Sequence, residues 1–300
     1  MKFGITLPYG SPDEPGASDP EFAVQVIRGA EELGFESIWA GEHVVMAGGY
    51  EALYPYSADG HAPVALDTAF PEPLTWLSWA AAHTSTIKLG TAVVVLPQRQ
   101  PVLLAKQAAT LDVMSKGRLI LGLGVGWQKE EMEALGYTYE DRGRRADEFI
   151  QALQELWCAD ESTFGGESVA FKNVYSYPKP TRPTGVPLLI GGHSSAAARR
   201  AGRFAQGMFA LVNDPETAAT LREEMCQAAR SAGRGTDDLE LTVGRPPIPR
   251  EAITPKLLDE LKGFRDAGVD RLVLFRLFDS DPIELKATLE SFKDKVMDRL

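Results

Sequence analysis

The chain has 300 residues, of which 44% are hydrophobic, so it can bury a large core as a single domain over residues 1–300. A formal net charge of -11 argues against nucleic acid or an anionic membrane as partner and favours a small-molecule substrate. Cys158 and Cys226 match no disulfide or zinc pattern, and the chain has no signal-peptide pattern or membrane-length apolar run, which favours a cytoplasmic location.

Hydrophobic periodicity predicts eight strands that alternate with eight helices. The strands are expected at residues 2–7, 37–40, 89–95, 119–123, 187–190, 207–210, 239–243 and 271–275. The helices are expected at residues 20–33, 73–83, 101–114, 141–157, 194–204, 215–232, 255–267 and 282–296. Eight such repeats in a chain of this length predict an α/β fold, a (β/α)8 TIM barrel.

Two segments exceed ordinary connections and are predicted to be insertions after strands 2 and 4. The first, residues 41–72, follows the second strand on the catalytic face. Its aromatic and histidine residues include Tyr50, Tyr54, Tyr56, His61 and Phe70. Two interpretations are open, a substrate lid or a solvated excursion with scattered aromatic side chains. The second, residues 159–185, is predicted to form a hairpin and a proline-rich return.

Three alternating glycines, Gly122, Gly124 and Gly126, follow the fourth strand. They do not complete a dinucleotide-binding fingerprint, because the sixth position is Trp127 and not glycine. In addition, the acidic pair about 20 residues on, Glu140 and Asp141, precedes a helix rather than ending a second strand. We expect the glycines to clear space for a cofactor, with Trp127 as a wall of the cleft. A structural role for Trp127 is the alternative.

An anion site is predicted where the fifth strand meets its helix, at Gly191, Gly192, His193 and Ser194. Free backbone N–H groups at a helix N-terminus attract anions, and phosphate is the expected guest. The alternative for Ser194 is an ordinary N-cap.

An acid/base candidate, His43, lies just beyond the second strand, at the end where barrels place catalysis. A His43 that only orients a bound ring is the alternative. Its neighbour Glu42 either supports His43 in catalysis or pairs with an arginine, and Trp39 either packs in the core or flanks the site. The scattered histidines show no metal-ligand spacing, so no metal site is expected.

Three segments, taken together, resemble the bacterial luciferase-like family of flavin and deazaflavin oxidoreductases. They read GFESIWAGEHV, KLGTAVVVLPQRQPVLLAKQAATLDVMSKGRLILGLGVGW and PLLIGGHSSAAARRAGRFAQGMF. The branch that the chain resembles most uses the deazaflavin coenzyme F-420. The resemblance implies a (β/α)8 barrel, commonly a homodimer, with a strand bulge beneath the cofactor ring. It also implies a cis peptide between Ala92 and Val93 at this bulge, next to Thr91.

The leading functional hypothesis is therefore an oxidoreductase that transfers a hydride between coenzyme F-420 and a small organic substrate, with His43 moving the proton. The first alternative is an FMN-dependent monooxygenase on the same scaffold that receives reduced flavin from a partner reductase. The second alternative, from another class, is a cofactor-binding barrel without turnover. Cofactor identity is implied by the resemblance alone.

Overall fold

The computed structural model describes residues 1–10, 16–51, 53–246, 248–275 and 281–300. Its main sheet runs in the order β3-β2-β1-β11-β10-β9-β8-β5-β4, and pairing between β3 and β5 closes it into a barrel. The pairings are parallel throughout. Since β3 and β4 are two parts of one interrupted barrel strand, the barrel has eight strand positions. The predicted (β/α)8 fold is confirmed.

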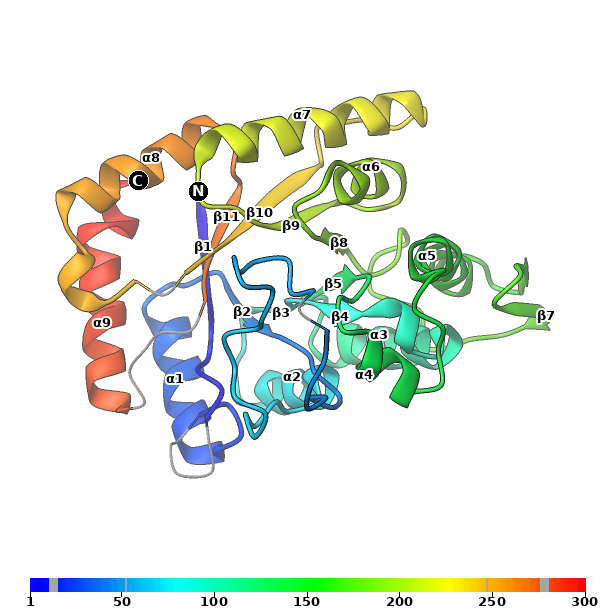
Figure 1. The fold of residues 1–300 in the computed structure, drawn as a ribbon, viewed down its shortest axis with the longest axis horizontal. Coiled ribbons are helices and arrows are strands. Elements are labelled where there is room, and N and C mark those ends of the chain that lie inside the picture. The colour runs from blue at the N-terminus through cyan, green and yellow to red at the C-terminus, as the bar shows by residue number, and fades with distance from the viewer. Residues whose placement is uncertain (11–15, 52, 247, 276–280) are drawn as a thin grey trace.

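The observed elements follow the predicted ones closely. The barrel strands are β1 (Lys2–Thr6), β2 (Ser37–Ala40), β3 (Lys88–Thr91), β4 (Val94–Val95), β5 (Leu119–Gly124), β8 (Leu188–Gly191), β9 (Gly207–Leu211), β10 (Glu240–Arg245) and β11 (Arg271–Leu274). The helices around them are α1 (Pro20–Glu32), α2 (Pro73–His83), α3 (Pro101–Met114), α5 (Arg142–Cys158), α6 (Ser195–Phe204), α7 (Pro215–Ser231), α8 (Pro255–Asp266) and α9 (Pro282–Lys295). Figure 1 shows this outer layer of helices. One short helix, α4 (Lys129–Ala134), was not predicted.

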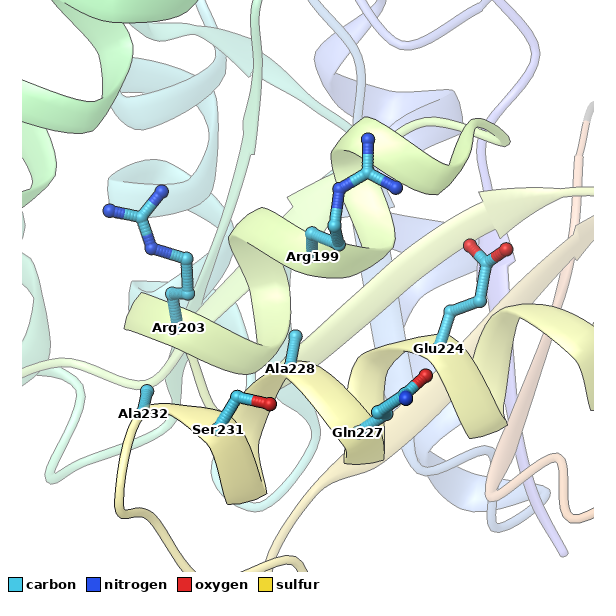
Figure 2. A pocket seen from close by; sticks show the side chains of 7 residues that line it. All are labelled: Arg199, Arg203, Glu224, Gln227, Ala228, Ser231 and Ala232. Atoms are coloured by element: carbon cyan, nitrogen blue, oxygen red, sulfur yellow. The ribbon is translucent and has the colours of Figure 1, made fainter.

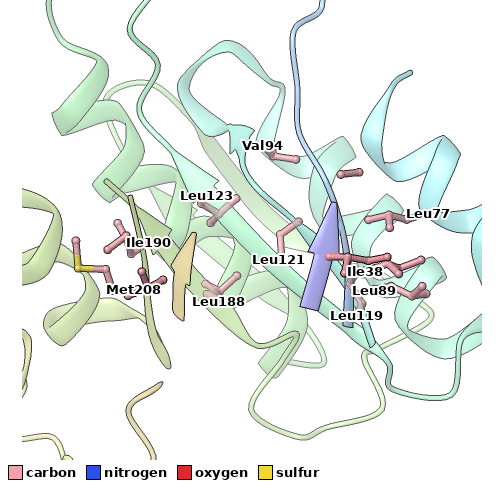
Figure 3. Close-up of a cluster of buried hydrophobic side chains, with 14 of the residues drawn as sticks. Ile38, Leu77, Leu89, Val94, Leu119, Leu121, Leu123, Leu188, Ile190 and Met208 are labelled. Atoms are coloured by element: carbon pink, nitrogen blue, oxygen red, sulfur yellow. The ribbon is translucent and has the colours of Figure 1, made fainter. Parts of the chain in front are cut away.

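Strand alternation divides the core into two clusters, because successive side chains of a strand point to opposite faces. Outward side chains such as Ile38, Leu121 and Ile190 pack beneath the helices (Figure 3). A smaller cluster fills the barrel interior, and it consists of Trp39, Ile120, Leu189, Phe209 and Val273. The barrel is therefore packed with side chains at mid-height and contains no pore there.

The amino end of the barrel is filled by a buried ion-pair network. Arg271, the first residue of β11, is only 1% exposed. Its guanidinium donates to the Glu36 carboxylate at 2.8 and 3.0 Å and to the Thr242 hydroxyl at 3.0 Å, and it lies 3.1 Å from Glu240. Because this network and the Trp39 layer occupy the lower barrel, the carboxyl end is the end that is left for a ligand.

The two insertions lie in different places. The second contains the predicted hairpin, β6 (Ser162–Gly165) paired antiparallel with β7 (Ala170–Val174), in the connection from α5 to β8. This connection leads into the amino end of β8, and the hairpin lies along α5, where Glu167 pairs with Arg144 and the Ser168 amide donates to Glu148 at 2.8 Å. In the described part of the first insertion the chain forms neither helix nor strand between β2 and α2. None of the described helices combines the length and apolar composition needed to span a membrane.

Candidate active site

A cavity of about 870 Å³ lies at the carboxyl end of the barrel strands. Its lining includes residues that directly follow four of those strands: Gly41 after β2, Ala92 after β3, Val212 after β9 and Phe275 after β11. Of the site residues predicted from sequence, Glu42, His43, Ala92 and His193 line it. Since barrel enzymes place their chemistry at this end, the cavity is the candidate active site.

The first insertion reaches across the mouth of this cavity. Phe70 packs against His43 with ring centroids 5.2 Å apart, and Tyr54 packs against Trp127 at 5.2 Å. Tyr56 contacts His193 at 4.8 Å, on the far side of the mouth. Because the segment makes ring contacts to the connections after both β5 and β8, the structure favours the lid interpretation over a solvated excursion.

His43 is held by a buried carboxylate. Its Nδ1 lies 3.0 Å from Glu131 Oε2, and the same carboxylate accepts hydrogen bonds from the amides of Val44 at 2.6 Å and Val45 at 3.4 Å. The side chains of His43 and Glu131 are 13% and 3% exposed. A carboxylate accepts and cannot donate, so Nδ1 carries a proton and Nε2 is the nitrogen that is left for proton exchange.

Glu131 is the residue that sequence reasoning missed. It lies in the first turn of α4, which at six residues is too short for a periodicity analysis to detect. The available signal was a pair of acidic residues, Glu130 and Glu131, soon after the glycine-rich end of β5. The sequence gives no indication that one of them faces a histidine 88 positions earlier.

For Glu42, which also lines the cavity, the structure favours the arginine-pairing alternative over support of His43. Its side chain is 1% exposed, forms an ion pair with Arg99 and accepts a hydrogen bond from the Val95 amide. Burial raises the pKa of the Glu42 carboxyl, and the Arg99 guanidinium opposes this shift. Glu42 therefore ties the end of β2 to the end of β4, which is the arginine-pairing alternative, and Glu131 takes the place next to His43.

The peptide bond between Ala92 and Val93 is cis, as the resemblance implied, and it separates β3 from β4. The glycines nearby pack closely against the interrupted strand. A Cβ atom built on Gly124 would lie 2.6 Å from a Val93 methyl, and one on Gly191 would lie 2.8 Å from another. A Cβ on Gly126 would lie 2.8 Å from a Val95 methyl. These three glycines make room for the interrupted strand, and their contact with a cofactor stays a prediction.

Two further predicted contacts, Trp39 and Thr91, lie beneath the cavity floor. Trp39 is 1% exposed, and its indole occupies the space that a side chain on Gly90 would need. The Thr91 hydroxyl is fully buried and donates to the Gly122 carbonyl at 2.7 Å. The structure thus favours the core-packing alternative for Trp39, and for both residues contact with a cofactor stays a prediction.

Trp127 stands behind His43, with the two ring centroids 5.8 Å apart. It also packs edge-on against Tyr50 at 5.1 Å and Tyr54 at 5.2 Å. The indole therefore joins the lid to the connection after β5 and packs against the imidazole.

The first turn of α6 borders the cavity at His193. Gly192 has φ +141°, a conformation that glycine adopts without strain. Ser194 is the N-cap, and its hydroxyl accepts from the Ala197 amide at 3.3 Å. The first amides of a helix have no intrahelical acceptor, so those of Ser195 and Ala196 can bind an anion. The Ser195 hydroxyl itself is occupied, since it donates to Glu224 at 2.9 Å.

A second cavity of about 440 Å³ lies outside the barrel, between α6 and α7 (Figure 2). Arg199 and Arg203 reach it from α6, and Glu224, Gln227 and Ser231 reach it from α7. It contains none of the predicted site residues. The described residues contain no group of three or more His, Cys, Asp or Glu side chains arranged to hold a metal ion.

Comparison with solved structures supports the fold. Monooxygenase RslO1 from Streptomyces bottropensis superposes with a TM-score of 0.83 at 21% identity, covering 100% of this chain and 99% of that one. An F-420-dependent secondary alcohol dehydrogenase, solved with an F-420-acetone adduct, superposes with a TM-score of 0.77 at 18% identity over 99% and 98% of the two chains. At these identities the likeness concerns the fold alone.

Sequence comparison identifies the family. An uncharacterized protein of Mycobacterium tuberculosis is 30% identical over 287 residues, which is 93% of this chain and 96% of that protein. The F-420-dependent glucose-6-phosphate dehydrogenase of Kineococcus radiotolerans is 30% identical over 272 residues, 88% of this chain and 65% of the relative. The family model described as luciferase-like monooxygenase matches residues 1–256. The chain belongs to the luciferase-like monooxygenase family.

Proposed function

We propose that the protein is an oxidoreductase that transfers a hydride between coenzyme F-420 and a small organic substrate in the mouth cavity. The observation that carries the proposal is His43, which lies on the cavity wall with Nδ1 fixed by the buried Glu131 carboxylate. The cofactor assignment is supported by the relative named as F-420-dependent at 30% identity over most of the chain.

The residues at the mouth fit a flat cofactor with a substrate beside it. A volume of about 870 Å³ lies within the range of about 300–1,000 Å³ typical of small-molecule sites. Ala92 offers a small side chain on the floor, and Tyr9 and Phe70 provide flat walls. At the cavity edge, the first turn of α6 beside His193 offers backbone amides and a helix dipole for a phosphate.

The side chains at the mouth cavity would have separate roles in the proposed reaction. A bound deazaflavin supplies hydride transfer, which no protein side chain provides. His43 Nε2 would exchange the proton with the substrate oxygen, while Glu131 holds the ring in one tautomer. The lid residues Tyr54, Tyr56 and Phe70 would exclude water from the reacting atoms.

A second candidate is an FMN-dependent monooxygenase. It is favoured by the description of the family model, luciferase-like monooxygenase, which matches residues 1–256. In that case the same cavity would hold reduced flavin delivered by a separate reductase.

Equilibrium titration of the apo-protein with F-420 and with FMN distinguishes the candidates. Our proposal expects F-420 to bind at least tenfold more tightly, a difference of about 1.4 kcal/mol. Tighter binding of FMN would favour the monooxygenase. Tight binding of either cofactor without any change in its redox state over a broad substrate panel would indicate a cofactor-binding barrel without turnover.

A further inference from the structure

A carboxylate from the neighbouring helix lies beside the proposed phosphate site. Glu224, in the middle of α7, accepts a hydrogen bond from the Ser195 hydroxyl at 2.9 Å. Ser195 is the first residue of α6, and its backbone amide is one of the two that the proposed function assigns to the cofactor phosphate. The same residue therefore contacts the carboxylate through its side chain and would contact the phosphate through its amide.

The negative charge of Glu224 has no direct counter-charge. Arg199 and Arg203 line the same groove, but in the described part of the chain neither forms an ion pair with Glu224. Arg203 lies 3.9 Å from Asp147, and Figure 2 shows it at the opposite end of the groove from Glu224. Arg199 is exposed, so water and salt screen its charge. The second carboxylate oxygen of Glu224, Oε2, is buried and accepts no hydrogen bond from the described residues. Glu224 therefore keeps its charge next to the first turn of α6.

Two anions would share the positive end of this helix. The N-terminus of a helix carries a partial charge of roughly +0.5, which stabilises a negative group nearby. A phosphate bound to the Ser195 amide would lie within roughly 10 Å of the Glu224 carboxylate, since both would contact the same residue. The Coulomb repulsion between the two anions is proportional to the charge of the phosphate. A doubly charged phosphate is therefore repelled about twice as strongly as a singly charged one.

The cation that lines the mouth cavity belongs to another part of the mouth. Arg245 ends β10, whereas α6 follows β8, and β9 lies between these two strands. With neighbouring strands about 4.8 Å apart, the backbone of Arg245 is about 10 Å from that of β8. Its guanidinium pairs with Glu260, and its buried Nε has no partner among the described residues. Whatever Arg245 binds, it is two strands away from the phosphate site and does not pair with Glu224.

We propose that Glu224 makes this site selective for a singly charged phosphodiester over a doubly charged phosphomonoester. The inference rests on the proposed function, which assigns the cofactor phosphate to the first turn of α6. A phosphomonoester carries a charge of about -1.5 to -2 at pH 7, whereas a diester carries about -1. F-420 contains its phosphate as a diester and FMN contains it as a monoester, so Glu224 would favour F-420. Glu224 is thus a specificity-determining residue that acts through its charge.

The test compares three flavins that differ only in the charge of the phosphate group. Riboflavin, riboflavin 5′-methyl phosphate and FMN have the same ring and carry about 0, -1 and -2 charges at about pH 8. Binding of each to the apo-protein is measured by calorimetry. Binding of F-420 is measured separately, so that its failure counts against the proposed function alone. We expect the methyl ester to bind at least fivefold more tightly than FMN. Equal affinity, tighter binding of FMN, or no measurable binding of either ester would overturn the inference.

Two glutamate variants isolate the charge of Glu224. Glu224→Gln keeps an oxygen for the Ser195 hydroxyl and removes the charge. In this variant FMN should bind about tenfold more tightly and the methyl ester about threefold, in proportion to their charges, and riboflavin should stay within about twofold. Glu223→Gln is the matched control, because Glu223 is the preceding residue of α7, has a side chain that is 72% exposed and pairs with Arg230. The control should leave all three affinities unchanged. If Glu224→Gln leaves the ratio of the two esters unchanged, or weakens FMN binding, Glu224 only holds Ser195 in place and the inference is wrong.

Arg199→Gln tests the remaining way to balance the second charge. Arg199 lies one helical turn after Ser195 and is exposed. Because we assign it no role in the site, this variant should change the ratio of FMN to methyl ester affinity by less than about twofold. A larger loss of FMN binding, with the methyl ester unaffected, would show that Arg199 neutralises a doubly charged phosphate. That result would overturn the proposed selectivity.

Discussion

Replacing Glu131 with glutamine should disable His43 without removing it. The carboxylate now accepts from His43 Nδ1 at 3.0 Å and from the Val44 amide at 2.6 Å. In Glu131→Gln, the amide oxygen can keep the Val44 hydrogen bond, which turns the NH2 group toward His43. A donor facing Nδ1 favours the opposite tautomer, with the proton on Nε2. The nitrogen facing the cavity would then be unable to accept a proton.

The size of the effect follows from the two roles of Glu131. General acid or base catalysis contributes about 10²- to 10⁴-fold in rate, so kcat for the proposed hydride transfer should fall at least 100-fold. Stability should fall less, by about 1–2 kcal/mol, because a neutral hydrogen bond replaces a charge-assisted one to the Val44 amide. Cofactor affinity should change by only a few-fold, since Glu131 is 3% exposed and does not line the cavity.

The assay combines kcat and KM, the F-420 dissociation constant and ¹⁵N chemical shifts of the His43 ring. Glu130→Gln is the matched control, because the neighbouring carboxylate accepts from the Glu51 amide at 3.1 Å and has no contact with His43 among its described hydrogen bonds. The control should retain wild-type kcat. If Glu131→Gln keeps both the wild-type rate and the wild-type tautomer, Glu131 does not position His43 for proton transfer.

Three further predictions concern the cofactor site and stability. Gly192→Leu should weaken F-420 binding at least tenfold in a titration. The reason is that φ +141° disfavours a residue with a side chain, and a Cβ atom on residue 192 would lie 2.9 Å from the Cβ of Ala197. Unchanged affinity would contradict the assignment of the phosphate site. Burial acts to raise the pKa of Glu31, but hydrogen bonds from three backbone amides outweigh it and hold the pKa at about 2. Its folded pKa lies below the unfolded value of 4.5, so Glu31 should contribute about 1–2 kcal/mol of stability above pH 4.5, and this contribution should be lost as the pH falls toward 2. In urea unfolding across this pH range, Glu31→Gln should lack the contribution. A pH profile of stability identical to that of the wild type would refute this prediction. Glu42→Gln should lower the free energy of unfolding by about 2 kcal/mol in the same assay, because it deprives Arg99 of its buried partner. It should change kcat less than threefold. A 100-fold loss of kcat would support Glu42 as a catalytic residue.

The fold was predictable because its signals are local. Barrel strands such as residues 119–123 are short apolar runs, and helices such as 101–114 begin at a proline and end before a glycine. The end of a strand also locates the catalytic face, which placed His43 and His193 at the cavity. The short helix α4 escaped detection because six residues cannot display a helical period.

The contacts that could not be predicted have a different cause, which is that packing inside a barrel joins strands far apart in the sequence. The absence of a side chain at Gly90 makes room for the indole of Trp39, 51 positions earlier, and this contact is apparent only in the closed barrel. Likewise, Gly124 and Gly191 face Val93 rather than open space. Glu42 and Glu131 are both acidic residues near the mouth. Glu42 pairs with Arg99 and Glu131 with His43 because the barrel closes, and the spacing of these residues in the sequence does not indicate either pair.

A crystal structure of the complex with F-420 tests the central claim most directly. The proposed function predicts the deazaflavin ring in the mouth cavity above Ala92, with its reactive face open to a substrate within about 3 Å of His43 Nε2, and the phosphate at the first turn of α6. A cofactor bound elsewhere, for example in the groove that Arg199 and Glu224 line between α6 and α7, would contradict it.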